Sequence, residues 1–165
     1  MSQYIKSYAI ISDCGDYRYQ LNRVWDESLP IVPFIMLNPS TADGNVDDPT
    51  IRRCVGFAKK WGYGGLIVVN LYALRATNPK ALLESENPFG DDNQMYLEKV
   101  FNDYNLIVAA WGNSSILSKI QKSNKLPLKG LQCSKLHYIE LSQDGTPKHP
   151  LYLKYTDSPK SFFNN

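Results

Sequence analysis

Polar side chains that could do hydrolytic chemistry gather in one short segment of the chain, residues 38–48. Asn38, Ser40 and Thr41 offer an amide, two hydroxyls and backbone N–H groups, which can position water, a base edge or a phosphate. Three carboxylates follow, each of a type that acts as a general base or binds Mg²⁺: Asp43, Asp47 and Asp48. Asp43 lies nearest to Asn38, and we expect it to assist catalysis. The alternative is a plain turn in a solvated loop.

Asn70 is a further candidate, because it interrupts an apolar run at residues 66–71. A buried amide without hydrogen-bond partners costs about 1–3 kcal/mol, so backbone groups satisfy it or it is kept for a ligand. An amide presents both a donor and an acceptor, and this combination suits the edge of a nucleobase. The sequence leaves both interpretations open.

Candidate phosphate ligands are scattered along the chain. Arg75 falls in a loop, Arg52 lies on the polar side of a predicted helix, and Ser114 begins another helix after an apolar run. Helix starts bind anions and basic side chains bind phosphate, although each of these residues is also an ordinary surface residue. The chain has neither GxxxxGKS/T nor GxGxxG, which argues against nucleoside-triphosphate and dinucleotide sites.

His149 precedes a proline after the last predicted strand, whereas His137 lies within that strand and is expected to be structural. A histidine beside a departing anion can donate a hydrogen bond to it; the alternative is a plain loop residue.

The three cysteines show no CxxC spacing, which argues against a disulfide framework or a zinc site. We expect no metal and no cofactor.

The hydrophobic pattern predicts the elements that position these residues. Residues 8–12 and 17–25 predict an N-terminal β-hairpin. Four apolar runs predict strands buried on both faces: residues 31–37, 66–71, 106–112 and 136–141. Asp48-Pro49 is a typical helix start with Asp48 as N-cap. The predicted helices cover residues 48–61, 78–83, 91–104 and a segment that begins near 113.

This alternation predicts an α/β fold, with a central, mainly parallel four-stranded sheet, helices on both faces and the N-terminal β-hairpin. We assign the 165 residues to one domain, with the hairpin over 1–29, the α/β core over 30–155 and a frayed tail over 156–165. Ligands bind such sheets at the carboxyl ends of the strands. The loops that should meet there are residues 38–48, 70–77, 112–115 and 143–149.

Bulk properties narrow the function. The net charge is only +2, so nucleic-acid binding would need a local basic patch. No apolar run approaches the ~20 residues of a membrane-spanning helix, and no secretory segment follows Met1. We therefore expect a cytoplasmic monomer without a membrane partner.

Four short motifs resemble those of the uracil-DNA glycosylase superfamily, in the same order along the chain. The strand ending in Asn38-Pro39 resembles the Gly-x-Asn-Pro motif of mismatch-type thymine/uracil glycosylases, with Met36 in place of the glycine. Asn70 resembles the base-reading asparagine of the next strand. The strand ending at Gly112 resembles the third motif, and residues 148–151 resemble the His-Pro-Ser loop with leucine instead of serine.

This resemblance implies a uracil-DNA-glycosylase-like fold and hydrolysis of the N-glycosidic bond of a nucleotide flipped out of DNA. Asn38 would position the attacking water with help from Asp43, and His149 would stabilise the departing base. The implied base-binding residues are Asn70, Pro39, Ser40 and Thr41. The implied DNA-phosphate ligands are Arg52, Arg75, Ser114 and Lys148.

The substrate is expected to carry a substituent, because no bulky tyrosine follows Pro39 and Ser40 is small. We expect DNA with a C5-modified pyrimidine, such as a hydroxymethylated or glucosylated base of phage DNA, rather than plain uracil. Base excision in phage defence, phage self-modification or repair would be the setting. The alternatives are a non-catalytic binder of modified DNA or nucleotides, an enzyme acting on free nucleosides or nucleotides, and a structural protein.

A closer resemblance covers most of residues 30–120. The motifs LNPSTAD, DPT and NLYALR resemble those of a family of small phage and bacterial proteins of unknown function. The resemblance implies no activity by itself.

Overall fold

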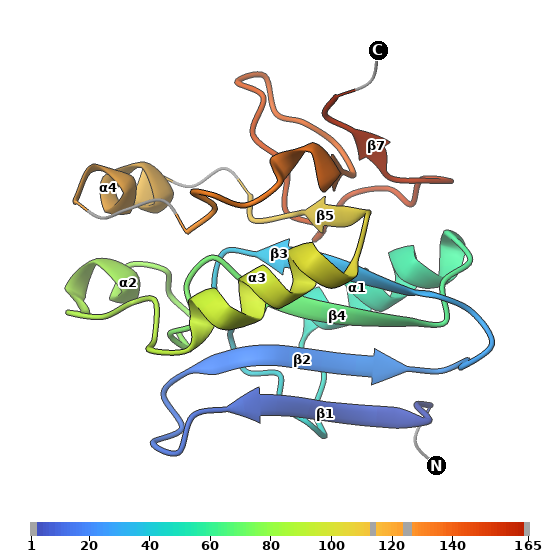
Figure 1. The fold of residues 1–165 in the computed structure, drawn as a ribbon, viewed down its shortest axis with the longest axis horizontal. Helices are drawn as coiled ribbons and strands as arrows, with labels where there is room; N and C mark the ends of the chain where they lie inside the picture. Colours follow the sequence, from blue (N-terminus) through green and yellow to red (C-terminus); the bar gives the residue numbers. More distant parts are fainter. Residues whose placement is uncertain (1–2, 113–114, 124–126, 164–165) are drawn as a thin grey trace.

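A computed structural model describes residues 3–112, 115–123 and 127–163 of the chain. Seven strands form one sheet in the order β1-β2-β4-β3-β5-β6-β7 (Figure 1). Their bounds are β1 Lys6–Ile11, β2 Arg18–Val24, β3 Ile31–Met36, β4 Gly65–Asn70, β5 Ile107–Ala109, β6 Leu136–Tyr138 and β7 Lys160–Ser161. The fold is therefore mixed α/β with a sheet wider than expected.

The strand directions correct the prediction of a mainly parallel four-stranded sheet. β3 runs parallel to β4 and β5, and β6 runs parallel to β5. β1 and β2 form the predicted hairpin, but β2 also pairs antiparallel with β4 and so extends the same sheet. At the other edge β7 pairs antiparallel with β6, in a tail that was expected to fray. Hydrophobic alternation identified β1 and β2 but not the pairing of β2 with β4, and the two residues of β7 are too few to show an alternation.

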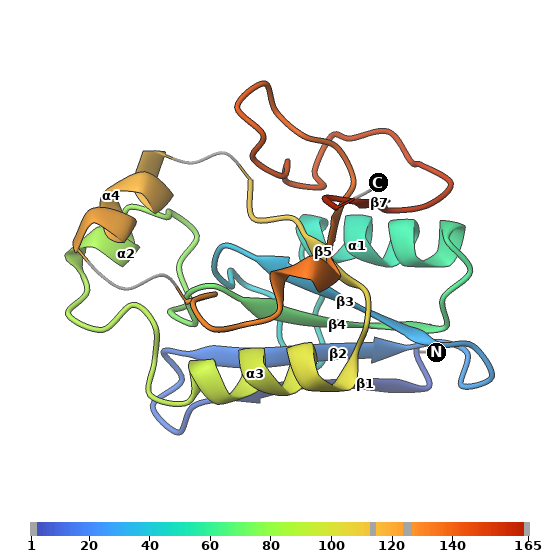
Figure 2. The same cartoon turned by 45° about the horizontal axis from the view of Figure 1, so that its top comes forward.

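Helices cover both faces of the sheet, as predicted, with α1 above it and α3 below it in Figure 2. α1 spans Pro49–Lys60, α2 Ala81–Glu84, α3 Asn93–Asp103 and α4 Ser115–Ser123, and a 3₁₀ turn covers Cys133–Lys135. The side chains of β3 alternate between the two layers. Phe34 packs with α1, whereas Ile35 packs with α3.

α1 shows how the local sequence fixes one wall of the later site. Asp48 caps the helix, since its Oδ1 accepts a hydrogen bond of 2.8 Å from the Ile51 N–H, and Pro49 occupies the first turn. Gly62, at φ +85°, ends the helix in the left-handed region as predicted. The start of α1 is thereby held at the carboxyl end of β3.

Within the described parts of the chain, no helix is long and apolar enough to cross a membrane.

Candidate ligand cavity at the switch point of the sheet

The connections of the parallel strands diverge next to β3. The chain passes from β3 through α1 to β4 on one side, and β5 then pairs with the other side of β3. Such a switch point leaves a crevice at the carboxyl ends of the strands. A cavity of about 470 Å³ opens there, a volume ordinary for small-molecule sites. Its lining comprises Arg18, Met36, Leu37, Asn38, Ser40, Asp48, Thr50, Ile51, Asn70, Ala76, Thr77, Pro79, Trp111, Gly112, His149 and Leu151.

Asn70 ends β4 at the cavity and is fully buried. Neither its side-chain Nδ2 nor its Oδ1 has a hydrogen-bond partner in the described structure. Its backbone carbonyl accepts a hydrogen bond of 2.9 Å from Asn93 Nδ2. The described backbone therefore does not satisfy this side chain. A buried amide in this state lowers the stability of the free protein by about 1–3 kcal/mol. The amide is an unsatisfied polar group in the wall of the cavity.

The Asn38 side chain is held by two backbone carbonyl groups. Its Nδ2 donates to the carbonyl oxygens of Ala76 at 2.9 Å and Pro39 at 3.1 Å. These bonds tie the loop after β3 to the loop after β4 and set the orientation of the amide. With Nδ2 engaged, Oδ1 is the atom left to accept a hydrogen bond from a water or ligand.

His149 reaches the cavity because Gly112 makes room for it. A Cβ on Gly112 would lie 3.2 Å from the His149 Cβ, and Gly112 has φ +82°. His149 Nδ1 accepts a hydrogen bond of 3.1 Å from the Leu151 N–H, which places the proton of a neutral ring on Nε2. Burial lowers the pKa of His149, and the Asp48 charge partly opposes this shift. The ring is therefore a neutral hydrogen-bond donor near pH 7.

Arg18 was not anticipated from the sequence. It begins β2, is only 2% exposed and lines the cavity. Its Nη1 donates to the Ala42 carbonyl at 2.9 Å, whereas the buried Nε has no partner among the described residues. Burial lowers the pKa of Arg18 to about 10 despite the favourable charge of Asp48, so the guanidinium stays cationic at neutral pH.

A β-bulge explains why Arg18 was missed. Ile10 pairs with Gln20 but Ile11 pairs with Arg18, so Tyr19 is an extra residue in β2. Tyr19 stacks on Tyr96 of α3 at 5.4 Å, although Leu21, two residues on, packs in the core beside α1. The alternation expected for Tyr19 and Leu21 is broken. Arg18 thereby comes to the α1 side, against Ala42.

Asp48, rather than Asp43, is the carboxylate of the cavity wall. Asp43 Oδ1 accepts hydrogen bonds from the backbone N–H groups of Asn45 at 2.8 Å and Val46 at 2.9 Å. These bonds lower the pKa of Asp43 and close a turn outside the cavity. Asp43 does not line the cavity with Asn38, and its backbone carbonyl accepts a hydrogen bond from Arg23 of β2.

Several other predicted site residues lie outside the cavity lining. Pro39 is buried and Thr41 is exposed, and of the predicted base-binding hydroxyls only Ser40 lines the cavity. Three predicted phosphate ligands are engaged with the protein itself, through Arg52 to the Asp47 carbonyl at 3.0 Å, Arg75 to the Gly15 carbonyl at 3.2 Å and Lys148 to Glu140 at 2.7 Å. Ser114 falls outside the described residues.

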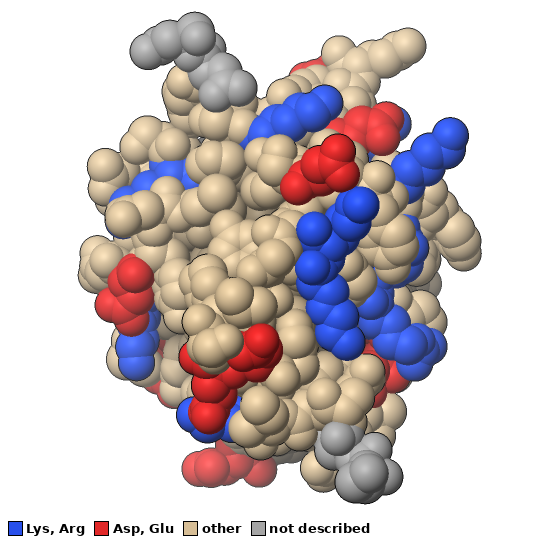
Figure 3. All heavy atoms as spheres, turned by 90° about the vertical axis from the view of Figure 1, so that its right-hand side faces the viewer, with Lys and Arg blue, Asp and Glu red and all other residues tan. Residues whose placement is uncertain are grey.

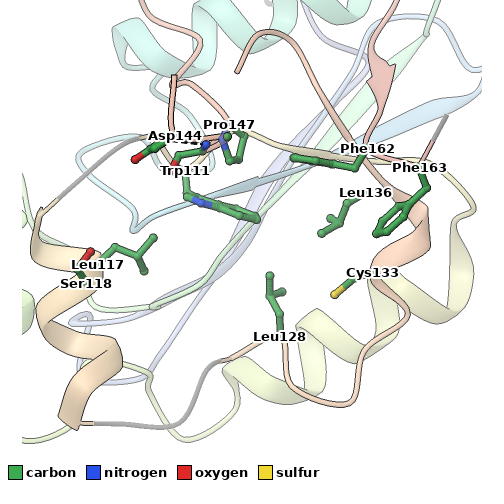
Figure 4. Close-up of a pocket in the computed structure, with 12 residues that line it drawn as sticks. Trp111, Leu117, Ser118, Leu128, Cys133, Leu136, Asp144, Pro147, Phe162 and Phe163 are labelled. Atoms are coloured by element: carbon green, nitrogen blue, oxygen red, sulfur yellow. Dashed lines mark hydrogen bonds between the residues drawn. The ribbon is translucent and has the colours of Figure 1, made fainter. Parts of the chain in front are cut away.

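A second cavity, of about 540 Å³, lies beside the first, and Trp111 borders both. Figure 4 shows its mainly apolar lining, with Leu128, Leu136, Cys133 and Phe162 around the space that Trp111 faces. The part of the chain that the structure describes contains no cluster of three or more side chains able to hold a metal ion.

The fold and the site define a mixed α/β protein with a cavity, lined by both polar and apolar side chains, at the switch point of its sheet. The chain belongs to DUF1643, a family of proteins of unknown function, which it matches over residues 18–151. No curated protein and no solved structure matches the chain. The resemblance to uracil-DNA glycosylases therefore stays a prediction from short motifs.

Proposed function

We propose that this protein is a DNA glycosylase that hydrolyses the N-glycosidic bond of a flipped-out, C5-modified pyrimidine and leaves an abasic site. The observation that carries the proposal is the Asn70 amide, which is buried at the cavity and whose donor and acceptor both lack a partner among the described residues. A pyrimidine edge offers the complementary acceptor and donor. A base inside a duplex cannot reach such a cavity, so the nucleotide has to be flipped out.

Three groups divide the chemistry. Asn70 binds the edge of the base. Asn38, held by the Ala76 and Pro39 carbonyls, uses Oδ1 to orient the water that attacks the sugar C1′. His149 donates from Nε2 to the base as negative charge develops on it, and a neutral ring does so without a counter-ion.

Asp48 takes the role that the sequence suggested for Asp43. Its carboxylate lines the cavity, and Oδ1 is held by the Ile51 N–H, so Oδ2 is the oxygen that a water can approach. A carboxylate is a stronger base than an amide, so Asp48 removes the proton from the water that Asn38 orients. Ser40, small and on the cavity wall, leaves space for the C5 substituent.

The test is a cleavage assay on DNAs that carry uracil, a thymine mismatch, 5-hydroxymethylcytosine or glucosylated 5-hydroxymethylcytosine. Alkali-labile abasic sites should form on a C5-modified substrate, and Asn38→Ala should abolish them without changing the melting temperature by more than a few degrees. Asn45→Ala is the matched control, since Asn45 is exposed and outside the cavity. Efficient cleavage of uracil DNA with no cleavage of any C5-modified base would reject the proposed substrate.

One observation favours a second candidate, an enzyme or binder for free nucleotides. The basic side chains expected to hold DNA are bonded to the protein itself. In Figure 3, which shows the right-hand side of Figure 1, basic and acidic side chains are interspersed, with one run of basic side chains. Duplex DNA binding releases counter-ions and falls steeply with salt. Tight binding of a free nucleotide with no salt-dependent DNA binding would select this candidate.

A further inference from the structure

We propose that Arg18 binds a phosphate group inside the cavity, so that the ligand is a nucleotide rather than a neutral base or nucleoside. This inference rests on the proposed function, because it concerns the same cavity. The phosphate belongs either to a free nucleotide or to the backbone of a flipped-out nucleotide in DNA, and the chemistry at Arg18 is shared by both.

The burial of Arg18 is the first support. The residue is 2% exposed, yet its Nε has no partner among the described residues and Nη1 has only the Ala42 carbonyl. Most buried polar groups in proteins are hydrogen-bonded, so an unpaired one at a cavity calls for an explanation. A ligand with acceptor oxygens completes the hydrogen bonds of the guanidinium.

The charge of Arg18 is the second support. The ion pairs within the described residues do not include Arg18, although Asp48 lies close enough to favour its charged form. Taking a cation out of water without pairing it is unfavourable. An anionic ligand offsets this cost, whereas a neutral base or sugar does not.

The geometry favours phosphate over other anions. A guanidinium presents several N–H groups in one plane, and phosphate oxygens match that arrangement. Thr50 lines the same cavity and places a hydroxyl group that can donate to a further oxygen. The bulge at Tyr19 points to the same use, because bulges beside sites re-aim side chains and this one brings Arg18 to the α1 side.

The experiment compares thymidine with thymidine 5′-monophosphate by calorimetric titration. The native protein should bind the monophosphate about tenfold or more tightly than the nucleoside. Arg18→Met should remove this preference and leave the affinity for thymidine unchanged, and Arg18→Lys should keep part of it. Asp48→Asn, which retains a capping side chain, should strengthen monophosphate binding by removing a repulsive charge.

Lys99→Met is the matched control, because it removes one positive charge from the exposed face of α3. Melting temperatures of all variants show whether they fold. Equal affinities for nucleoside and monophosphate in the native protein would overturn the inference. So would a preference for the monophosphate that survives in a folded Arg18→Met variant.

Two further measurements separate the sources of phosphate and the two proposals. Arg18-dependent binding of a modified oligonucleotide that displaces the monophosphate assigns the phosphate to DNA, whereas Arg18-dependent binding of the monophosphate alone assigns it to a free nucleotide. Abasic-site formation with an unchanged KM in Arg18→Met would reject this inference and keep the glycosylase. Arg18-dependent nucleotide binding without any abasic site would reject the glycosylase and keep this inference.

Discussion

Two buried arginines on β2 have opposite surroundings. Arg23 is fully buried and well bonded, with Nε 2.8 Å from Asp47 Oδ1, Nη1 donating to the Asn22 carbonyl at 3.0 Å and the guanidinium 5.5 Å from the centre of the Tyr4 ring. Arg18 is nearly as deeply buried, and its side chain has one such bond to the described residues, to the Ala42 carbonyl. The two residues are five positions apart in one strand.

The difference separates a charge that the protein satisfies fully from one that it leaves partly unsatisfied. At Arg23 the protein supplies every partner, so the charge anchors the loop of residues 43–47 to β2. At Arg18 the partners among the described residues are incomplete, and Asn70, which lines the same cavity, is in the same state. Polar groups left unpaired around one cavity mark a ligand site better than buried charge by itself.

The largest effect is expected at the structural arginine. Asp47→Ala should lower the free energy of unfolding by about 3–5 kcal/mol, because it leaves Arg23 buried without its counter-charge. Urea denaturation at pH 7 measures the loss. Asp103→Ala, at an exposed carboxylate of α3, should change stability by less than about 0.5 kcal/mol. A loss below about 1 kcal/mol in Asp47→Ala would remove the contrast between the two arginines.

Replacing Asn70 in the cavity should raise the free energy of unfolding, whereas replacing Asp47 should lower it. Asn70→Leu replaces an unsatisfied buried amide by an apolar side chain of similar shape, and stability should rise by about 1 kcal/mol. Binding of the base should weaken about tenfold or more, because its hydrogen bonds are lost. Denaturation and calorimetric titration measure the two effects. A protein destabilised by more than about 2 kcal/mol would show that Asn70 is structural.

Asp48 caps α1 and also lines the cavity, and two substitutions separate these two roles. Asp48→Ala removes the cap of α1 and should lower stability by about 0.5–2 kcal/mol, whereas Asp48→Asn keeps a capping oxygen and should cost little. If Asp48 also activates water, both variants should lose cleavage activity to a similar extent. Full activity in Asp48→Asn would leave Asp48 as a cap only.

The smallest expected effect is a dependence of the free energy of unfolding on pH that arises from His149. Burial lowers the pKa of His149 below its ordinary value of 6.5 in the folded state. As the pH falls below 6.5, the unfolded chain takes up the proton first, so the free energy of unfolding decreases until the pH passes the folded-state pKa. Melting temperatures between about pH 7.5 and 5 should show this decline, and His149→Gln should flatten it. An identical slope in the variant would place the titrating group elsewhere.

Much of the core of the site was predictable, because it depends on local signals. Asp48-Pro49 and Gly62 set the ends of α1, and apolar runs located β3, β4 and β5. The rule that ligands bind at the carboxyl ends of parallel strands then selected Asn38, Asn70 and His149, and all three line one cavity.

The remainder depended on backbone geometry that residue types do not encode. The bulge at Tyr19 reverses the alternation of β2, and no residue type between positions 17 and 21 indicates a bulge. The choice between Asp43 and Asp48 depends on a turn closed by the N–H groups of Asn45 and Val46. A charged residue in a predicted strand was the available signal for Arg18, but Arg23 of the same strand gives the same signal and is bonded to Asp47.

The position of Trp111 gives the protein its own optical probe. Trp25 and Trp61 are hydrogen-bonded through their indole nitrogens to Tyr63 and Thr156, in the layer packed around α1. Trp111 borders both cavities, so a ligand in either one changes the polarity around a single indole. Its fluorescence in a Trp25→Phe, Trp61→Phe background would follow occupancy of the site in real time, without a label on the protein or a coloured substrate.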